Sequence, residues 1–241
     1  MRYLFAVRCS FAVFLLLGAG GAASADPIRI TQDRRVVTAV IEANGITQSE
    51  QAIGRDTMSE AVISPSGVAR ASLTSSIANP LQWFGFGVSD VATATQGGTV
   101  ADLAEASFGV GFDVVAPVAF TFVAEFVSST GGSQPNGRAL WRAALVSGEA
   151  AEPRQRFFFE EGGGPAQRLF TGLLTPGQYF LEVSAENVGR LDGAGSRSGN
   201  AAFDFNFGLA PTAASPTPEP ASLLLLGTGV CTLFGKRIWV R

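Results

Sequence analysis

Strict alternation of large apolar residues with polar or small ones constrains the fold of this 241-residue chain more than any other feature. It is clearest at 203–209, where the odd positions hold three phenylalanines and a leucine and the even positions hold Asp204, Asn206 and Gly208. Successive side chains of a β-strand point to opposite faces, so a period of two residues puts one set in a core and the other in water. The pattern therefore predicts a half-buried strand of an antiparallel sheet.

Similar alternation at 108–114, 120–126 and 179–185 predicts three more strands. Five other segments are rich enough in apolar residues to be strands: 34–43, 67–77, 138–147, 155–160 and 166–174. Residues 99–106 are the one segment expected to form a turn or two of helix.

Glycine and proline clusters separate these segments. The clusters are Asn44-Gly45, Pro65-Ser66-Gly67, Gly97-Gly98, Gly131-Gly132, Pro135-Asn136-Gly137, Gly162-Gly163-Gly164 and Thr175-Pro176-Gly177-Gln178. In the last one, proline followed by glycine suits a type II turn. Many short strands joined by such turns predict an all-β fold, an antiparallel β-sandwich over 26–209, with the jelly roll as a candidate arrangement.

Residues 26–220 contain neither cysteine nor histidine, because the two cysteines are Cys9 and Cys231 and the chain has no histidine. This composition excludes disulfides, Cys and Ser-His nucleophiles, a histidine base and ordinary structural zinc sites in this segment. We expect no cofactor.

The same 195 residues carry 12 arginines, no lysine and 20 acidic residues, so the net charge is 12 − 20 = −8. Nucleic-acid affinity comes largely from neutralising phosphates, so an acidic domain is not expected to bind nucleic acid. The charge is expected to keep the folded domain soluble, with calcium loading or tethering in a matrix as the alternative.

The first 25 residues have the layout of a secretory signal peptide. Arg2 and Arg8 precede an apolar run at 11–17, and Ala23 and Ala25 supply the small residues that signal peptidase requires. An N-terminal membrane anchor is disfavoured, because the run is short and ends in glycines. We expect cleavage after Ala25 and export.

The C-terminus has three parts, which follow a linker at 210–217 rich in Pro, Ala, Thr and Ser. The first part is a rigid tripeptide, the second an apolar stretch at 221–235, and the third a basic end. A helix over 221–235 would be roughly 22 Å long. It is shorter than the ~30 Å hydrocarbon core, and bilayer thinning with snorkelling of the basic residues would let it insert as a transmembrane helix.

The tail at 218–241 resembles the PEP-CTERM sorting signal of exported proteins in Gram-negative bacteria. Its tripeptide and basic residues match that signal: Pro218, Glu219, Pro220, Lys236, Arg237 and Arg241. One departure is that 238–240 separates Arg241 from the other two basic residues, where the family usually has a compact run. The match covers 24 of the 241 residues.

The resemblance implies processing by an exosortase, a membrane-embedded enzyme thought to cleave near the tripeptide. It also implies a precursor held transiently in the inner membrane, then a product at the cell surface, in the outer membrane or in the extracellular matrix. Proteins with this tail accompany exopolysaccharide and biofilm production. We therefore expect a structural or exopolysaccharide-associated protein without catalytic activity, whose processing partners are signal peptidase and exosortase.

Two alternatives remain open: a carboxylate-dependent glycan-active enzyme, and a calcium-stabilised carbohydrate-binding or adhesion module. Glu160 and Glu161 are the nearest approach to a catalytic pair, but neighbours in a strand face opposite ways. Glu125 is expected to face solvent. Four aspartates remain that the fold could bring together: Asp90, Asp102, Asp113 and Asp204.

The stretch 191–200 contains one carboxylate among glycines and serines, so a flexible hairpin loop is favoured over a calcium loop. Trp83 and Trp141 could stack on sugars, but burial in the core is favoured. Arg154 and Arg156 precede three phenylalanines and are expected to guard a sheet edge.

Overall fold

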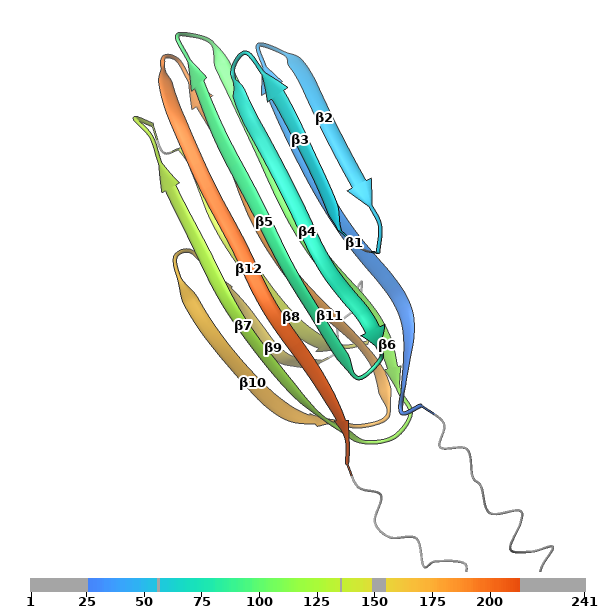
Figure 1. The fold of residues 1–241 in the computed structure, drawn as a ribbon. Helices are drawn as coiled ribbons and strands as arrows, with labels where there is room; N and C mark the ends of the chain where they lie inside the picture. The colour runs from blue at the N-terminus through green and yellow to red at the C-terminus, as the bar shows by residue number, and fades with distance from the viewer. Residues whose placement is uncertain (1–25, 56, 135, 149–154, 213–241) are drawn as a thin grey trace, which may run out of the picture.

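The computed structural model describes residues 26–55, 57–134, 136–148 and 155–212, and these form twelve strands and no helix (Figure 1). The strands are β1 (Ile28–Ala43), β2 (Ile46–Ile53), β3 (Met58–Ser64), β4 (Gly67–Asn79), β5 (Gln82–Thr95), β6 (Thr99–Val114), β7 (Val118–Gly131), β8 (Gly137–Ser147), β9 (Gln155–Gly162), β10 (Ala166–Leu174), β11 (Gly177–Asp192) and β12 (Gly195–Pro211). Within this described part, no helix is long and apolar enough to span a membrane.

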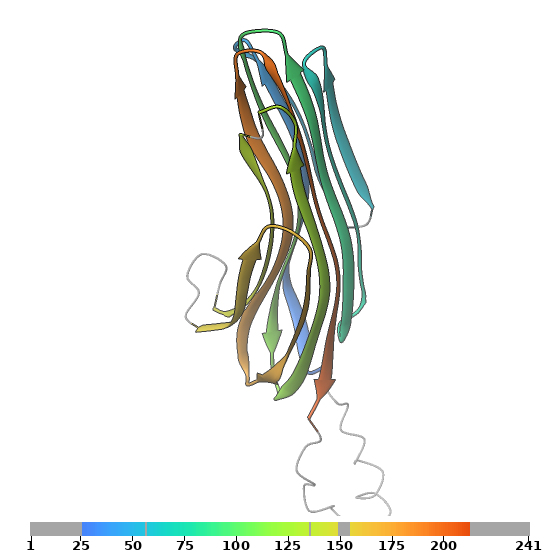
Figure 2. The ribbon, with the colours of Figure 1, turned by 90° about the vertical axis from the view of Figure 1, so that its left-hand side faces the viewer.

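The strands form two six-stranded antiparallel sheets that pack face to face, as the edge-on view in Figure 2 shows. We call them sheet A, in the order β2-β1-β6-β11-β8-β9, and sheet B, in the order β10-β7-β12-β5-β4-β3. The predicted all-β fold with two antiparallel sheets is therefore confirmed.

The chain passes repeatedly between the two sheets from β5 onward. Strands β5, β7, β10 and β12 lie in sheet B, and β6, β8, β9 and β11 lie in sheet A. In each sheet one late strand is inserted between two early ones: β12 separates β5 from β7, and β11 separates β6 from β8. β1 and β2 extend sheet A beyond β6, while β4 and β3 extend sheet B beyond β5.

Aromatic side chains from both sheets fill the space between them. Trp83 of sheet B meets Phe112 of sheet A edge-on, with 4.9 Å between ring centroids. Phe126 of sheet B stacks on Trp141 of sheet A at 4.2 Å. Both tryptophans are buried, so the expectation that they belong to the core is confirmed.

All nine segments expected to be strands lie within strands of the structure. The expected helix at 99–106 is wrong, because these residues form the first half of β6 and pair with both β1 and β11. The expected loop at 191–200 is also wrong for most of its length, since β11 runs to Asp192 and β12 begins at Gly195. Strands β2, β3 and β5 were not expected.

Two of the predicted turns have informative backbone angles. Asn44 and Gly45 have φ of 51° and 78°, as a two-residue type I′ hairpin turn requires. At Gly177 the φ of 159° is far from the value near +80° of a type II turn, so that expectation is wrong. Gly177 instead begins strand β11.

Both ends of the described chain lie at one end of the sandwich (Figure 1). The turn between β6 and β7 joins them. The Val115 N–H donates to the Pro27 carbonyl at 2.9 Å, and Thr212 donates to the Pro117 carbonyl through its N–H at 3.3 Å and its hydroxyl at 2.7 Å. We call this end of the sandwich the terminal pole.

Candidate functional site

A cluster of glutamates and arginines covers the centre of the outer face of sheet A. Glu105 of β6 lies directly opposite Glu186 of β11 in the strand register, and Glu182 lies four residues away along β11 on the same face. All three glutamates are half-buried. Like charges directly opposite each other repel, so this arrangement needs compensation.

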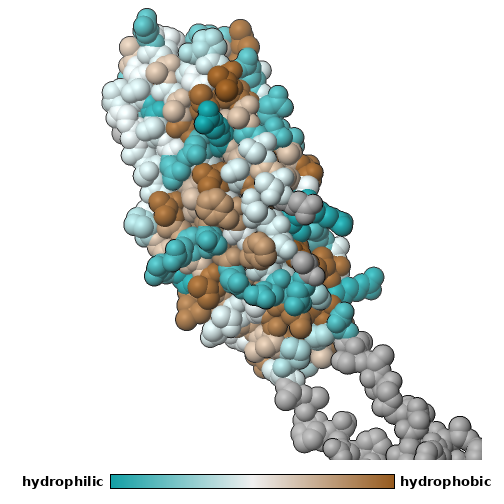
Figure 3. All heavy atoms as spheres, in the orientation of Figure 1, coloured by the Kyte–Doolittle hydropathy of each residue, from teal (hydrophilic) through white to brown (hydrophobic). Residues whose placement is uncertain are grey.

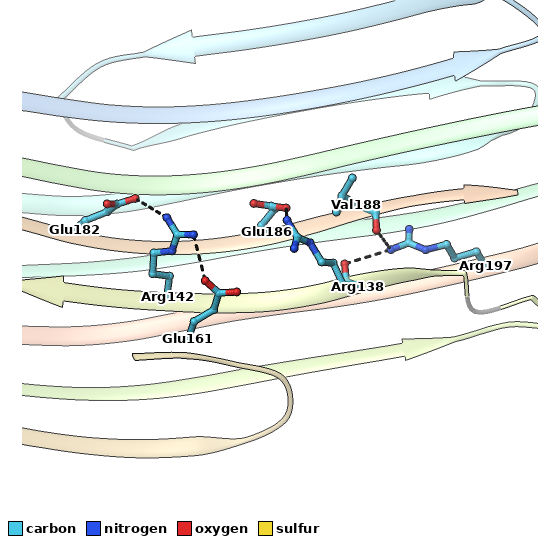
Figure 4. Close-up of polar contacts among 7 residues, drawn as sticks. All are labelled: Arg138, Arg142, Glu161, Glu182, Glu186, Val188 and Arg197. Atoms are coloured by element: carbon cyan, nitrogen blue, oxygen red, sulfur yellow. Dashed lines mark hydrogen bonds and ion pairs between the residues drawn. The ribbon is translucent and has the colours of Figure 1, made fainter. Parts of the chain in front are cut away.

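Two arginines of β8 supply that compensation (Figure 4). Arg138 contacts Glu186 at 3.2 Å. Arg142 lies between Glu161 of β9, at 3.1 Å, and Glu182, at 3.9 Å. These pairs are a third or more exposed, so each one stabilises the fold only slightly.

Within the described part of the chain Glu105 forms no such ion pair, and its pKa is raised above the usual carboxyl value. Burial is the main cause, followed by the negative charges of Glu186 and Glu182; Arg34 and Arg142 act in the opposite direction. Glu105 therefore keeps its proton to a higher pH than an ordinary carboxyl does. A carboxyl of this kind is chemically able to act as a general acid.

The carboxylates singled out in the sequence are not brought together. Glu160 and Glu161 take different partners, since Glu160 pairs with Arg168 of β10 and Glu161 pairs with Arg142. Glu125 is exposed, as expected, and accepts a hydrogen bond from Gln167 at 2.8 Å.

The four aspartates also lie apart. Asp102 is inside the sandwich and Asp113 points to the outer side of sheet A, whereas Asp90 and Asp204 lie on the outer face of sheet B. In the described ranges, no group of three or more Asp or Glu residues is arranged to hold a metal ion.

An interior ion pair joins the two sheets. Arg197 of β12 and Asp102 of β6 pair with both side chains at 0% exposure. The Thr93 hydroxyl donates to the second Asp102 oxygen at 2.9 Å, and Arg197 Nη2 donates to the Val188 carbonyl at 3.0 Å. Arg197 also reaches the Arg138 carbonyl, which links this interior pair to the glutamate cluster on the outer face of sheet A (Figure 4).

The sequence contains a pattern that places Arg197 in the core, although residues 191–200 were expected to form a loop. Odd-numbered residues of β12 face the core from Phe207 back to Phe203, and continuing this parity places Arg197 inside. Gly137 and Gly189 leave space for its side chain, because a Cβ at either one would overlap Arg197 Nε.

Two adjoining hollows mark the outer face of sheet B. The larger, of about 450 Å³, is lined by residues of β4, β5, β7 and β12, with Arg70, Asp90, Ser129, Ser198 and Asn200 as its polar groups. The smaller, of about 320 Å³, shares Ala92 and Ser198 and extends to the β3–β4 turn at Pro65 and Ser66. No glutamate is among the described residues that line either hollow.

The targeting residues expected from the sequence lie outside the described residues. They are Ala23, Ala25, Pro218, Glu219, Pro220, Lys236, Arg237 and Arg241. Arg154 and Arg156 were expected to guard a sheet edge. Arg154 lies outside the described residues, while Arg156 is in β9, an edge strand of sheet A.

Comparisons with known proteins give no family. No family model matches the chain, and no curated protein matches it. Two solved structures of infectious bursal disease virus are distantly similar. The Gx strain structure is 8% identical over 78% of this chain and 60% of that chain, and the Gt strain structure is 10% identical over 83% and 70%; both TM-scores are 0.21. At that TM-score the likeness carries no argument about function.

Proposed function

We propose that this is an exported, exosortase-processed protein of the cell surface or extracellular matrix of a Gram-negative bacterium, with a structural or exopolysaccharide-associated role and no catalytic activity. Residues 1–25 act as signal peptide, 26–209 as the β-sandwich, 210–217 as linker and 218–241 as sorting signal with a transmembrane helix at 221–235. The interleaved order of β5–β12 supports classing these eight strands as a jelly roll.

One observation carries the proposal furthest: the chain enters and leaves the sandwich at the terminal pole. Pro27 and Thr212 bond to the same β6–β7 turn. Asp26 and Thr212, the ends of the described chain next to the two targeting segments in sequence, therefore lie at one end of the domain. A domain held at the membrane by its C-terminal tail would keep its opposite pole and both outer faces free for contacts outside the cell.

The glutamate cluster favours the glycan-active enzyme as the second candidate. Glu105, with its raised pKa, and Glu186, paired with Arg138, are two carboxyls in different electrostatic environments on neighbouring strands. Structural ion-pair networks shift pKa values in the same way, and this cluster lies outside both hollows of sheet B. A purified chain that released reducing ends from polysaccharides, and lost this activity on Glu105→Gln, would establish the enzyme.

Cell fractionation tests the proposal. In one variant Pro218, Glu219 and Pro220 are replaced by alanine, and in a matched control Pro216 of the linker is replaced instead. We expect wild type and control outside the inner membrane and the tripeptide variant retained within it. Equal distribution of all three forms would overturn the proposal.

A further inference from the structure

Two phenylalanines of β5 point away from the core. Phe84 is 49% exposed and Phe86 is 48% exposed, although both belong to a strand buried on its other face. They are two residues apart on one face, so their Cα atoms are separated by roughly 7 Å along the strand. Together they form a small aromatic platform on the outer face of sheet B.

Polar side chains border this platform on both neighbouring strands. Across β12, Phe84 lies opposite Asn206 and Phe86 lies opposite Asp204. Across β4, Thr74 lies opposite Phe86. All three polar residues are exposed. Figure 3 shows the result for this whole face, where hydrophobic and hydrophilic residues are interleaved.

The larger hollow lies further along the same face of the same strand. Asp90, which lines it, is four residues beyond Phe86, or roughly 14 Å along the strand. The side-chain amide of Asn200 donates to Asp90, and Arg70 lies opposite Asp90 on β4. Ser129 and Ser198 add hydroxyls, and the small residues Ala92 and Gly199 leave the volume open.

This combination has a definite chemical preference. A flat aromatic ring packs against the C–H face of a sugar ring, and amides, carboxylates and hydroxyls bond to sugar hydroxyls. Charged residues are depleted from the cores of protein–protein interfaces, so the charged and polar border of the platform is not typical of a protein-binding surface. Asp204 and Glu125 give this part of the face negative charge, which disfavours an anionic polymer.

We propose that the outer face of sheet B binds a neutral polysaccharide along β5, with Phe84 and Phe86 as stacking platform and the Asp90–Asn200 hollow as hydrogen-bonding subsite. This inference rests on the proposed exopolysaccharide association and names the surface and the class of glycan.

Affinity electrophoresis of the full chain, purified in mild detergent, tests the inference. The gels contain one of three neutral polysaccharides (dextran, laminarin or galactomannan) or alginate as the acidic one. The test variant is Phe84→Ser with Phe86→Ser. The matched control is Phe159→Ser, which removes a phenylalanine that is 43% exposed on the outer side of sheet A. Asn200→Ala probes the hollow.

We expect at least one neutral polysaccharide to retard wild type and Phe159→Ser, with affinity roughly tenfold weaker in the double variant and also reduced in Asn200→Ala. Circular dichroism confirms that each variant folds, and a double variant that unfolds is replaced by Phe84→Leu with Phe86→Leu, for which weaker retardation is again expected. Absence of retardation by all three neutral polysaccharides, retardation by alginate alone, or undiminished binding in the platform variants overturns the inference.

Because the full chain is used, this result does not depend on processing. If a chain that cells fail to export still binds the polysaccharide, the proposed binding face of sheet B is supported and the assignment to the cell surface is overturned. If the chain is exported normally but does not bind, the binding face is overturned and the assignment to the cell surface is supported.

Discussion

Arg197 and Asp102, 95 residues apart in the chain, form an ion pair that is completely enclosed between the two sheets. Thr93 and the Val188 carbonyl bond to the same pair. Removing one charge from such a pair leaves the other without compensation in a medium that solvates it poorly. The pair therefore fixes how β12 of sheet B is placed over β6 of sheet A.

Asp102→Ala is expected to lower the free energy of unfolding by about 3–5 kcal/mol, because it leaves the buried Arg197 guanidinium without a counter-charge. Asp192→Ala is the matched control, since it removes an exposed carboxylate that also contacts an arginine, Arg190 at 3.0 Å. Urea unfolding measures both variants. Similar small losses in the two would show that the interior pair does not hold the sheets together.

Gly85→Ala is expected to destabilise the core where β5 packs against β12. A Cβ at residue 85 would lie 2.6 Å from Phe205 Cε1, so the ring would have to shift. Overpacking of this kind costs about 1–3 kcal/mol. Gly97→Ala, where no atom lies within 4 Å, is the control and should change thermal unfolding little. A neutral Gly85→Ala would mean that Phe205 does not occupy this place.

The stability of the protein is expected to depend on pH through Glu105. Its pKa is raised above the ordinary value of 4.5, so the folded state keeps the proton to higher pH than the unfolded chain does. Wild type therefore loses stability as pH rises from that ordinary value through the raised pKa, and the loss persists above it.

Glu105→Gln cannot ionise and is expected to lack this loss. Relative to wild type, it should gain stability as the pH of urea unfolding is raised from about 4 to about 8. Glu50→Gln, on the exposed strand β2, serves as the comparison. A Glu105→Gln profile parallel to that of wild type would contradict the raised pKa.

Calcium is expected to leave the melting temperature unchanged. Within the described residues no group of three or more acidic side chains could hold a metal ion, and Asp192 lies at a tight β11–β12 turn, where it contacts Arg190. Differential scanning fluorimetry with calcium and then with a chelator measures this. A melting temperature that rises with calcium and falls with the chelator would favour the calcium-stabilised module.

The sequence predicted the strands whose large residues face inward. It did not predict β5, because the phenylalanines of β5 face outward and Gly85 and Gly87 face the core, where they make room for Phe205 and Phe203. Residues 99–106 contain alanines and Glu105, which favour a helix locally, but pairing with β1 and β11 overrides that preference. β2 is exposed along nearly its whole length, so it carries no alternating pattern.

The glutamate cluster could not be predicted, because it depends on strand order. Glu105 and Glu186 meet only because β11 inserts between β6 and β8, a long-range pairing that no local pattern encodes. The interior pair could be predicted in part, because the alternation along β12 places Arg197 in the core. That Asp102 is its partner could not be predicted, because this contact depends on how the two sheets pack.

Intact-mass measurement of the protein recovered outside the inner membrane shows whether the tail is removed. We expect a chain that begins at Asp26 and ends near Pro220, without the apolar segment 221–235. A chain that keeps residues 221–241 would contradict this expectation, because the tail would then be a permanent anchor and the assignment to an exosortase-processed surface protein would fail.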